Sequence, residues 1–189
     1  ECETEYTTDT RRRHAQTISC HDCGPQLLFQ LGEKRLEGAE ALEEGVRLLR
    51  SGAVLALKGI GGYQFACDPR NGDAVQKLRL LKHRERKPFA VMVSSLDSIR
   101  EICRMDGEEE ALLTSPARPI VLLRKKHDRF CPGVSGESRF LGAFLPYTGL
   151  HQLLTDACGP LVMTSANLTD DPILTDDPEA LSLSCKYLS

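Results

Sequence analysis

The chain has 189 residues, a net charge of −3, a pI near 6.0 and 41% hydrophobic residues. This length fits one domain with its own core and a small appendage, and the acidic balance argues against non-specific nucleic-acid binding over the whole surface. No apolar run approaches the roughly 18–20 residues of a membrane span, and the polar N-terminus is unlike a signal peptide. We therefore expect a cytoplasmic protein without a membrane partner.

The first thirty residues carry the pattern of a metal site. Cys20 and Cys23 form a C-x-x-C pair followed by Gly24, and two thiolates at this spacing can hold one tetrahedral Zn²⁺. Zinc requires four ligands, and Cys2 lies where a second pair is expected, about 15–20 residues upstream. The sequence therefore predicts a structural zinc site with ligands Cys2, Cys20 and Cys23, incomplete within this chain, and a free or redox-active dithiol is the alternative. The less favoured substitute ligands are His14 and His21.

The body of the chain alternates helical and strand-like patterns. Apolar residues recur at helical spacing over 38–50, and Gly52 follows as a stop signal. Taken in chain order, the patterns predict helix 38–50, strands 53–57 and 63–67, a turn at 68–72, helix 73–84, strand 89–93, helices 95–104 and 108–113, strands 120–123 and 141–145, helix 149–156 and strand 161–163. This alternation predicts an α/β fold with a helix-covered, mixed sheet.

A dense group of cations follows the predicted helix 73–84. Lys82, Arg84, Arg86 and Lys87 fall within six residues. Cations at a helix C-terminus complement its dipole, but one or two suffice for that purpose. Four repel one another unless an anion neutralises them, so we expect an anion here, and phosphate oxygens suit both Arg and Lys.

Two further stretches are candidates for the same site. Residues 58–62 read Lys-Gly-Ile-Gly-Gly, and such glycines let backbone N–H groups approach a ligand, although a plain tight turn is equally compatible. Thr164, Ser165 and Asn167 follow the predicted strand 161–163. Their hydroxyl and amide groups suit phosphate or ribose at the carboxyl end of a strand, whereas a turn or helix cap is the more common interpretation.

Other chemistry-bearing residues receive structural interpretations. We interpret His151 as a surface histidine of the helix 149–156, in preference to a substrate role. Three single cysteines lie in apolar company and are expected to be inert core thiols, namely Cys67, Cys103 and Cys158.

Five motifs, in this order, carry a resemblance to a known family: "LKGIGGYQFACD", "LRLLKHRERKPFAVMV", "SPARPIVLLR", "LGAFLPYTGLHQLL" and "LVMTSANLTDDPI". Together they resemble the YrdC-type domain of the HypF carbamoyltransferases of hydrogenase maturation. The preceding "CHDCGP" resembles the end of the zinc-finger region in that family. The resemblance covers nearly all of residues 2–178.

The resemblance implies a twisted mixed sheet with surrounding helices and a basic concave face, preceded by a partial zinc finger. It implies that ATP, with Mg²⁺, and carbamoyl phosphate yield a carbamoyl-adenylate. A further C-terminal domain would pass the carbamoyl group to a hydrogenase-maturation protein, where it becomes the cyanide ligand of the nickel–iron centre. A basic cluster without an obvious general base suits such chemistry, since its catalysis consists mainly of positioning and charge cancellation.

The resemblance also assigns roles to individual residues. Lys82 and Arg84 match the basic pair that holds phosphates and are the catalytic candidates. The expected nucleotide-binding residues are Lys58, Lys87, Thr164, Ser165 and Asn167, and the less specific matches are Arg118 and Tyr147. The K-G-x-G-G form around Lys58 replaces the threonine-containing segment of stand-alone YrdC relatives, which disfavours a threonine substrate.

The resemblance also sets the expected domain organisation. Residues 1–30 would be the C-terminal part of a zinc-finger region, 36–178 a YrdC-like ATP-binding domain, and 179–189 an irregular, truncated tail. One alternative function is a threonylcarbamoyl-adenylate synthase for tRNA modification, and another is a non-catalytic fragment that binds nucleotide or zinc. Binding of double-stranded RNA or tRNA to a basic face is disfavoured by the net negative charge.

Overall fold

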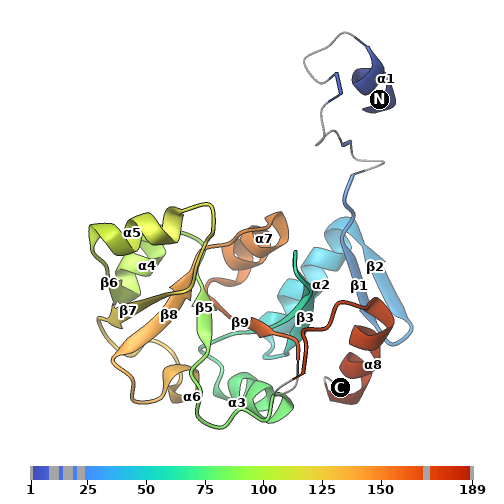
Figure 1. Cartoon of the computed structure of the whole chain (residues 1–189). Coiled ribbons are helices and arrows are strands. Elements are labelled where there is room, and N and C mark those ends of the chain that lie inside the picture. Colours follow the sequence, from blue (N-terminus) through green and yellow to red (C-terminus); the bar gives the residue numbers. More distant parts are fainter. Residues whose placement is uncertain (1, 9–12, 15–18, 21–23, 168–170, 188–189) are drawn as a thin grey trace.

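The computed structural model of the chain describes residues 2–8, 13–14, 19–20, 24–167 and 171–187 (Figure 1). Its helices are α1 (Cys2–Thr7), α2 (Gly38–Arg50), α3 (Gly72–Leu81), α4 (Leu96–Ile102), α5 (Gly107–Thr114), α6 (Pro132–Ser135), α7 (Gly149–Cys158) and α8 (Asp177–Tyr187). Its strands are β1 (Leu28–Leu31), β2 (Lys34–Glu37), β3 (Leu55–Lys58), β4 (Tyr63–Cys67), β5 (Ala90–Met92), β6 (Cys103–Arg104), β7 (Val121–Lys125), β8 (Phe140–Phe144) and β9 (Leu161–Ser165).

A seven-stranded sheet forms the centre, with the order β3-β4-β9-β5-β8-β7-β6. β5 and β8 run parallel, while the other neighbouring pairs are antiparallel. The predicted mixed α/β fold is therefore confirmed. β9, the last strand in the sequence, lies between β4 and β5, so its carboxyl end comes beside segments that are distant along the chain.

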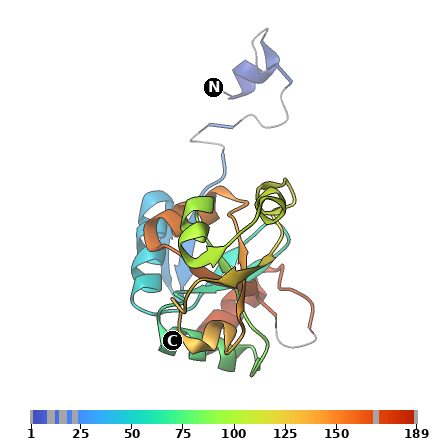
Figure 2. The same cartoon turned by 90° about the vertical axis from the view of Figure 1, so that its left-hand side faces the viewer.

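Helices cover both faces of the sheet. One face packs against α3, α4, α5 and α6, through a core that includes Leu78, Ile99, Leu113 and Val134. The other face packs against α2 and α7, which lie side by side (Figure 2). Successive side chains along each strand point to opposite faces, so the strands contribute residues to both cores.

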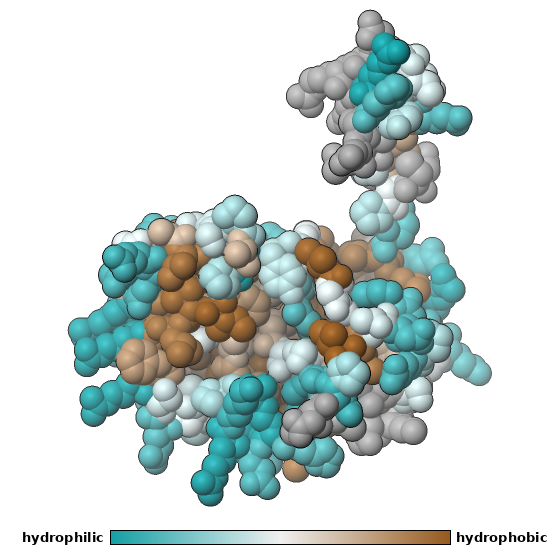
Figure 3. Space-filling view, viewed as in Figure 1, coloured by the Kyte–Doolittle hydropathy of each residue, from teal (hydrophilic) through white to brown (hydrophobic). Residues whose placement is uncertain are grey.

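Helices α2 and α7 cover only part of the sheet face on which they pack, and the β7–β8 part of that face is exposed. On β7 and β8 the core residues Leu123 and Leu141 alternate with exposed Leu122 and Phe140, which face the opposite side. Figure 3 shows this apolar surface over the β7–β8 half of the sheet.

The cation-rich segment 82–88 precedes β5, the neighbour of β8 in the sheet.

The segment before α2 and the C-terminal tail differ from the sequence-based expectations. Strands β1 and β2 form a separate antiparallel hairpin that was not predicted. Its two-residue turn begins with Gly32 at a φ of 55°, and a glycine in this position is a hairpin signal that the apolar periodicity does not carry. The tail 179–189, expected to be irregular, instead supplies most of α8, and buried Ala180 anchors this helix to the body.

Helix α3 is shorter than the predicted 73–84. It begins after Asn71, whose side chain accepts a hydrogen bond from the Ala74 N–H, and it ends at Leu81. His83 then takes a φ of 48°, which ends the helical path well before Pro88. The cation-rich residues therefore lie in a loop, which we call the basic loop (residues 82–88).

Candidate functional site

The basic loop joins the carboxyl end of β9 through one buried lysine. Lys82 is only 6% exposed. Its Nζ donates to the Ser165 carbonyl at 2.5 Å, to the Asn167 carbonyl at 2.8 Å and to Asn167 Oδ1 at 2.9 Å. Buried charges require such hydrogen bonds. The contact therefore fixes two of the predicted stretches against each other.

Neighbouring cations act on Lys82. The pKa of its ammonium group is lowered from the usual 10.5 to about 8, mainly by burial and in addition by the charges of Arg84 and Lys87. Lys87 is exposed, so its ammonium group is available to a ligand in solvent. Three positive groups within mutual electrostatic range favour an anion.

Arg84 shapes the loop as well as facing β9. Its Nε donates to the Lys87 carbonyl at 3.1 Å and its Nη2 donates to the Pro88 carbonyl, while Nη1 approaches Thr164 Oγ1 at 3.4 Å. The guanidinium also lies 4.7 Å from the ring centroid of Phe89, a cation–π distance. Arg84 is thus pre-positioned by the loop that it helps to form.

Arg79, at the end of α3, holds the basic loop in place, a role that no sequence motif indicates. Its Nη1 donates to the carbonyls of Arg84 and Glu85 at 2.6 and 2.9 Å, and its Nε donates to the Gly133 carbonyl at 2.8 Å. Its guanidinium lies 4.9 Å from the Phe89 ring. Its position inside a predicted helix gave no sign that it would organise the following loop.

The end of β9 presents a compact polar group. Ser165 Oγ donates to Asn167 Oδ1 at 2.6 Å, and Asn167 Nδ2 donates to the Asp171 carbonyl at 2.8 Å. Thr164 lies opposite Phe65 in the β4–β9 register and faces Arg84. Five predicted site residues are thereby brought together, and they are Lys82, Arg84, Thr164, Ser165 and Asn167.

The glycine stretch 58–62 forms a turn beside this group. The Gly59 N–H donates to the Gly62 carbonyl at 2.8 Å. Gly62 has a φ of 134°, and a Cβ there would lie 2.6 Å from the Leu174 carbonyl, so only glycine fits. Lys58 forms an ion pair with Asp177 at the start of α8, away from the contacts of Lys82. The nucleotide-binding role predicted for Lys58 stays a prediction.

The two less specific matches also have defined positions. Arg118 has a φ of 45° and donates through Nη1 to the Leu113 carbonyl at 3.4 Å. Tyr147 Oη accepts a hydrogen bond from Gln64 Nε2 at 2.6 Å. Tyr147 therefore contacts β4 directly, next to the strand that carries Ser165.

His151 corrects the sequence interpretation. It is 1% exposed, whereas we expected a surface residue. The α7 face that carries it packs towards the sheet, because His151, Leu154 and Thr155 are all buried. The predicted core thiols Cys67, Cys103 and Cys158 are confirmed as buried, and burial raises the pKa of each thiol.

Two of the three predicted zinc ligands, Cys2 and Cys20, lie in the part of the chain that the structure describes. Cys2 begins α1 and Cys20 precedes a turn in which the Gly24 N–H donates to the Cys20 carbonyl at 2.7 Å, while Cys23 lies outside the described residues. A Cβ at Gly24 would lie 2.5 Å from that carbonyl, so the turn requires glycine. Among the described residues no group of three or more His, Cys, Asp or Glu side chains could hold a metal.

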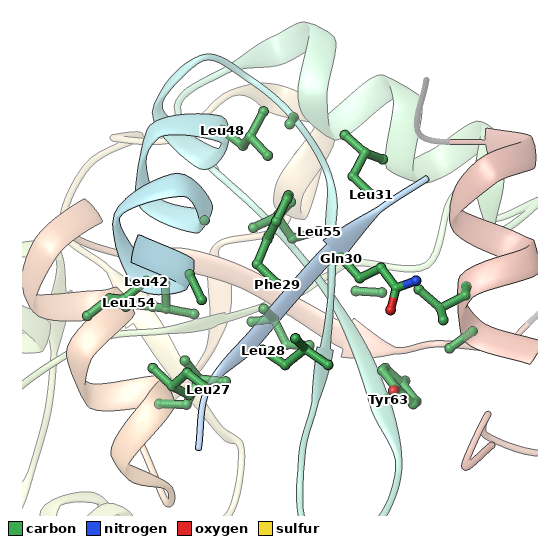
Figure 4. Close-up of a pocket in the computed structure, with 18 of the residues that line it drawn as sticks. Leu27, Leu28, Phe29, Gln30, Leu31, Leu42, Leu48, Leu55, Tyr63 and Leu154 are labelled. Atoms are coloured by element: carbon green, nitrogen blue, oxygen red, sulfur yellow. The ribbon is translucent and has the colours of Figure 1, made fainter. Parts of the chain in front are cut away.

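A separate apolar pocket of about 260 Å³ lies between the β1 strand, α2, β3, α7 and α8 (Figure 4). Phe29, Leu42, Leu48 and Leu55 point into it. None of the basic-loop residues lines this pocket. Its apolar wall does not suit phosphate, so the polar group at the end of β9 remains the candidate functional site. No helix in the described part of the chain is long and apolar enough to cross a membrane.

Comparisons with known proteins identify the family of this chain. Residues 47–184 match the family Sua5_yciO_yrdC, described as "Telomere recombination", and residues 1–29 match the family described as "HypF finger". Carbamoyltransferase HypF of Rhodobacter capsulatus is 43% identical over 184 residues, covering 95% of this chain and 24% of that protein. The chain thus spans about a quarter of the length of this relative.

Two further relatives extend the comparison. A crystal structure of full-length HypF in the phosphate- and nucleotide-bound form has a TM-score of 0.89 and 38% identity, and the match covers 99% of this chain and 25% of that one. Threonylcarbamoyl-AMP synthase of Xanthomonas axonopodis pv. citri is 33% identical over 140 residues, covering 69% of this chain and 73% of that protein. The chain belongs to the Sua5–YciO–YrdC family, in the form that HypF-type carbamoyltransferases carry behind a HypF finger.

Proposed function

We propose that the chain binds ATP at the end of β9 and forms a carbamoyl-adenylate, as a part of carbamoyl transfer in nickel–iron hydrogenase maturation. The observation that carries this proposal is buried Lys82, which joins the basic loop to Ser165 and Asn167. A cationic group that is fixed before substrate arrives stabilises developing negative charge without reorganisation. Support also comes from the HypF relatives, one of which was crystallised with phosphate and nucleotide.

The proposed chemistry brings two anions together. Water releases carbamate and phosphate from carbamoyl phosphate. A carbamate oxygen then forms a bond to the α-phosphorus of ATP, while the bond from that phosphorus to the bridging oxygen breaks and pyrophosphate leaves. Lys82, Arg84 and Lys87 would offset the negative charge, and Thr164, Ser165 and Asn167 would orient the nucleotide. When bound, Mg²⁺ would shield the phosphate oxygens further.

The flanking regions receive proposals of their own. Residues 1–30 would end a zinc-finger region, with thiolates of Cys2, Cys20 and Cys23 among the Zn²⁺ ligands, because thiolate donors suit structural zinc. A reducing cytoplasm would keep these thiols available. Residues 36–178 would form the ATP-binding domain, and α8 extends the ordered part beyond it. The carbamoyl group would leave for a hydrogenase-maturation acceptor through a transferase domain.

A second candidate function is threonylcarbamoyl-adenylate synthesis. The specific observation in its favour is the relative from Xanthomonas, because the match covers most of that protein. The replacement substrate would be the carbamate of L-threonine, and the attack on the α-phosphorus would be the same. The two functions therefore differ in the acid that is adenylated.

The test is pyrophosphate release from ATP by the purified chain. The three substrate arms are carbamoyl phosphate, ammonium carbamate, and L-threonine with bicarbonate, and Lys82→Ala is the control. Release with either carbamoyl source that disappears in Lys82→Ala supports the proposal. Release only with threonine and bicarbonate supports the second candidate. Nucleotide binding without release in any arm would contradict adenylation by this chain.

A further inference from the structure

A cluster of buried polar atoms beside the candidate site takes no part in the contacts described so far. Within the described residues, Gln64 Oε1 and both ring nitrogens of His151 are buried and make no hydrogen bond to the protein. Both residues meet at Tyr147, since Gln64 Nε2 donates to its hydroxyl at 2.6 Å and the His151 ring stands edge-on to its ring with centroids 4.6 Å apart. Buried polar atoms are hydrogen-bonded in most proteins, so this group requires an explanation.

The chemistry of the cluster is mixed. Burial lowers the pKa of His151 to about 4, so at neutral pH its imidazole carries one N–H donor and one bare nitrogen acceptor. Gln64 Oε1 is a second acceptor. The cluster thus offers one donor and two acceptors, and it carries no charge of its own.

The cluster adjoins the end of β9. Gln64 lies directly opposite Ser165 in the β4–β9 register, so both side chains are on one face of the sheet. Ser165 is joined to Asn167, which binds Lys82. A Cβ on Gly59 would lie 3.6 Å from Gln64 Oε1, so the glycine turn passes beside the same carbonyl. The cluster therefore lies one strand away from the polar group that binds Lys82.

We propose that Gln64, Tyr147 and His151 form the carbamoyl subsite of the adenylation site, with Gln64 and His151 as positioning residues for carbamate. This inference rests on the proposed function. The carbamate NH₂ group has two hydrogens, which match the two acceptors of the cluster, Gln64 Oε1 and the bare nitrogen of His151. Bicarbonate has one hydroxyl in place of this amino group, and the carbamate of threonine is much larger, so the subsite would select unsubstituted carbamate.

The test varies ammonium carbamate and ATP separately in steady-state assays of pyrophosphate release. The variants are His151→Phe, which keeps a ring without nitrogens, and Gln64→Met, which keeps the length of the side chain. Each is expected to raise KM for carbamate about tenfold, as for one lost neutral hydrogen bond, with kcat and KM for ATP within about twofold. The matched control is Thr155→Val, because the Thr155 hydroxyl is buried on the same helix and bonds only to helix carbonyls of His151 and Gln152.

A KM for carbamate that is unchanged in folded variants would overturn the proposal, as would equal increases for carbamate and ATP. Thermal melting of each variant establishes folding. A second measurement tests carbamate binding without requiring adenylation. The imidazole NMR signal of His151 is followed during titration with ammonium carbamate and a non-hydrolysable ATP analogue. Potassium bicarbonate is the probe that lacks the amino group. A saturable response to carbamate alone, lost in Gln64→Met, would support the subsite even if no pyrophosphate were released, and no response would overturn it.

Discussion

Lys82, predicted as a catalytic residue, and Lys58, predicted as a nucleotide-binding residue, lie in contrasting surroundings. Lys82 is 6% exposed and its Nζ is held by oxygens of Ser165 and Asn167. The Lys58 side chain is 55% exposed and pairs with Asp177. An ammonium group that is buried and fixed has little freedom to lose when a phosphate binds, whereas an exposed ion pair contributes little and is screened by salt. We therefore expect Lys82 to contribute more to phosphate binding than Lys58. This difference depends on burial, which the sequence motifs do not reveal.

The largest expected effect tests the buried side of this comparison. Lys82→Ala should slow the single-turnover release of pyrophosphate with carbamate. The expected loss of transition-state stabilisation is roughly 2–4 kcal/mol, on the scale of a lost oxyanion donor. Rapid-quench assays at saturating ATP provide the measurement. A rate within about threefold of the wild-type rate would show that Lys82 has only a structural role.

Asn167→Asp should have the next largest effect. The new carboxylate would lie at the position of Asn167 Oδ1, 2.9 Å from Lys82 Nζ, and would neutralise the lysine and repel phosphate. We expect ATP to bind about tenfold more weakly while the melting temperature is maintained. Calorimetric titration and thermal melting measure the two effects, and unaltered ATP affinity would argue that phosphate binds elsewhere.

The pKa of Lys82 predicts an unusual pH dependence. In the unfolded chain this lysine keeps its proton up to the usual 10.5, whereas in the folded protein it loses it near pH 8. Between these values the unfolded state binds more protons, so the contribution of Lys82 to stability rises with pH. ATP affinity should fall several-fold over the same range, because the ammonium charge is lost.

Denaturation and ATP titration at pH 7.5 and 9.5 are the measurements. Lys82→Met is the reference because it cannot titrate. Parallel pH profiles of the wild type and Lys82→Met would contradict this prediction.

His151 extends the comparison to a buried neutral group. Its pKa is lowered from 6.5 to about 4, so as the pH falls from 6.5 to 4 the unfolded state takes up the proton and the fold loses stability. His151→Phe should remove this part of the acid sensitivity. Urea denaturation of the wild type and of His151→Phe at pH 6.5 and 4.5 is the measurement. An equal loss of stability in both proteins would refute the role assigned to His151 in acid sensitivity.

The smallest effect is expected on the exposed side. Lys58→Ala should lower the melting temperature by no more than about 2 °C, with ATP affinity within about twofold of the wild type. Salt should reduce even this difference. A tenfold loss of ATP affinity would return Lys58 to the nucleotide site and would remove the contrast with Lys82.

The elements with strong periodicity were predicted well. The helix 38–50 is α2 as expected, because its apolar stripe faces the sheet, and the strand 63–67 is β4. The hairpin β1–β2 was missed because its short strands are largely exposed and leave no buried alternation. Helix α3 ended early because the backbone turns at His83, and a positive φ at a histidine has no signature in the sequence.

The sequence by itself determined the α/β class, the family and the chemistry available at the site, since motifs such as K-x-R and T-S-A-N specify side chains and their spacing along the chain. Only the tertiary structure decided which of these side chains meet. Placing β9 between β4 and β5 brought Lys82 to Asn167 and set Gln64 opposite Ser165. The same packing buried His151, which its place in the sequence did not predict. The reason is physical: strand order and helix packing fix distances across the chain, and local residue patterns carry no information about them.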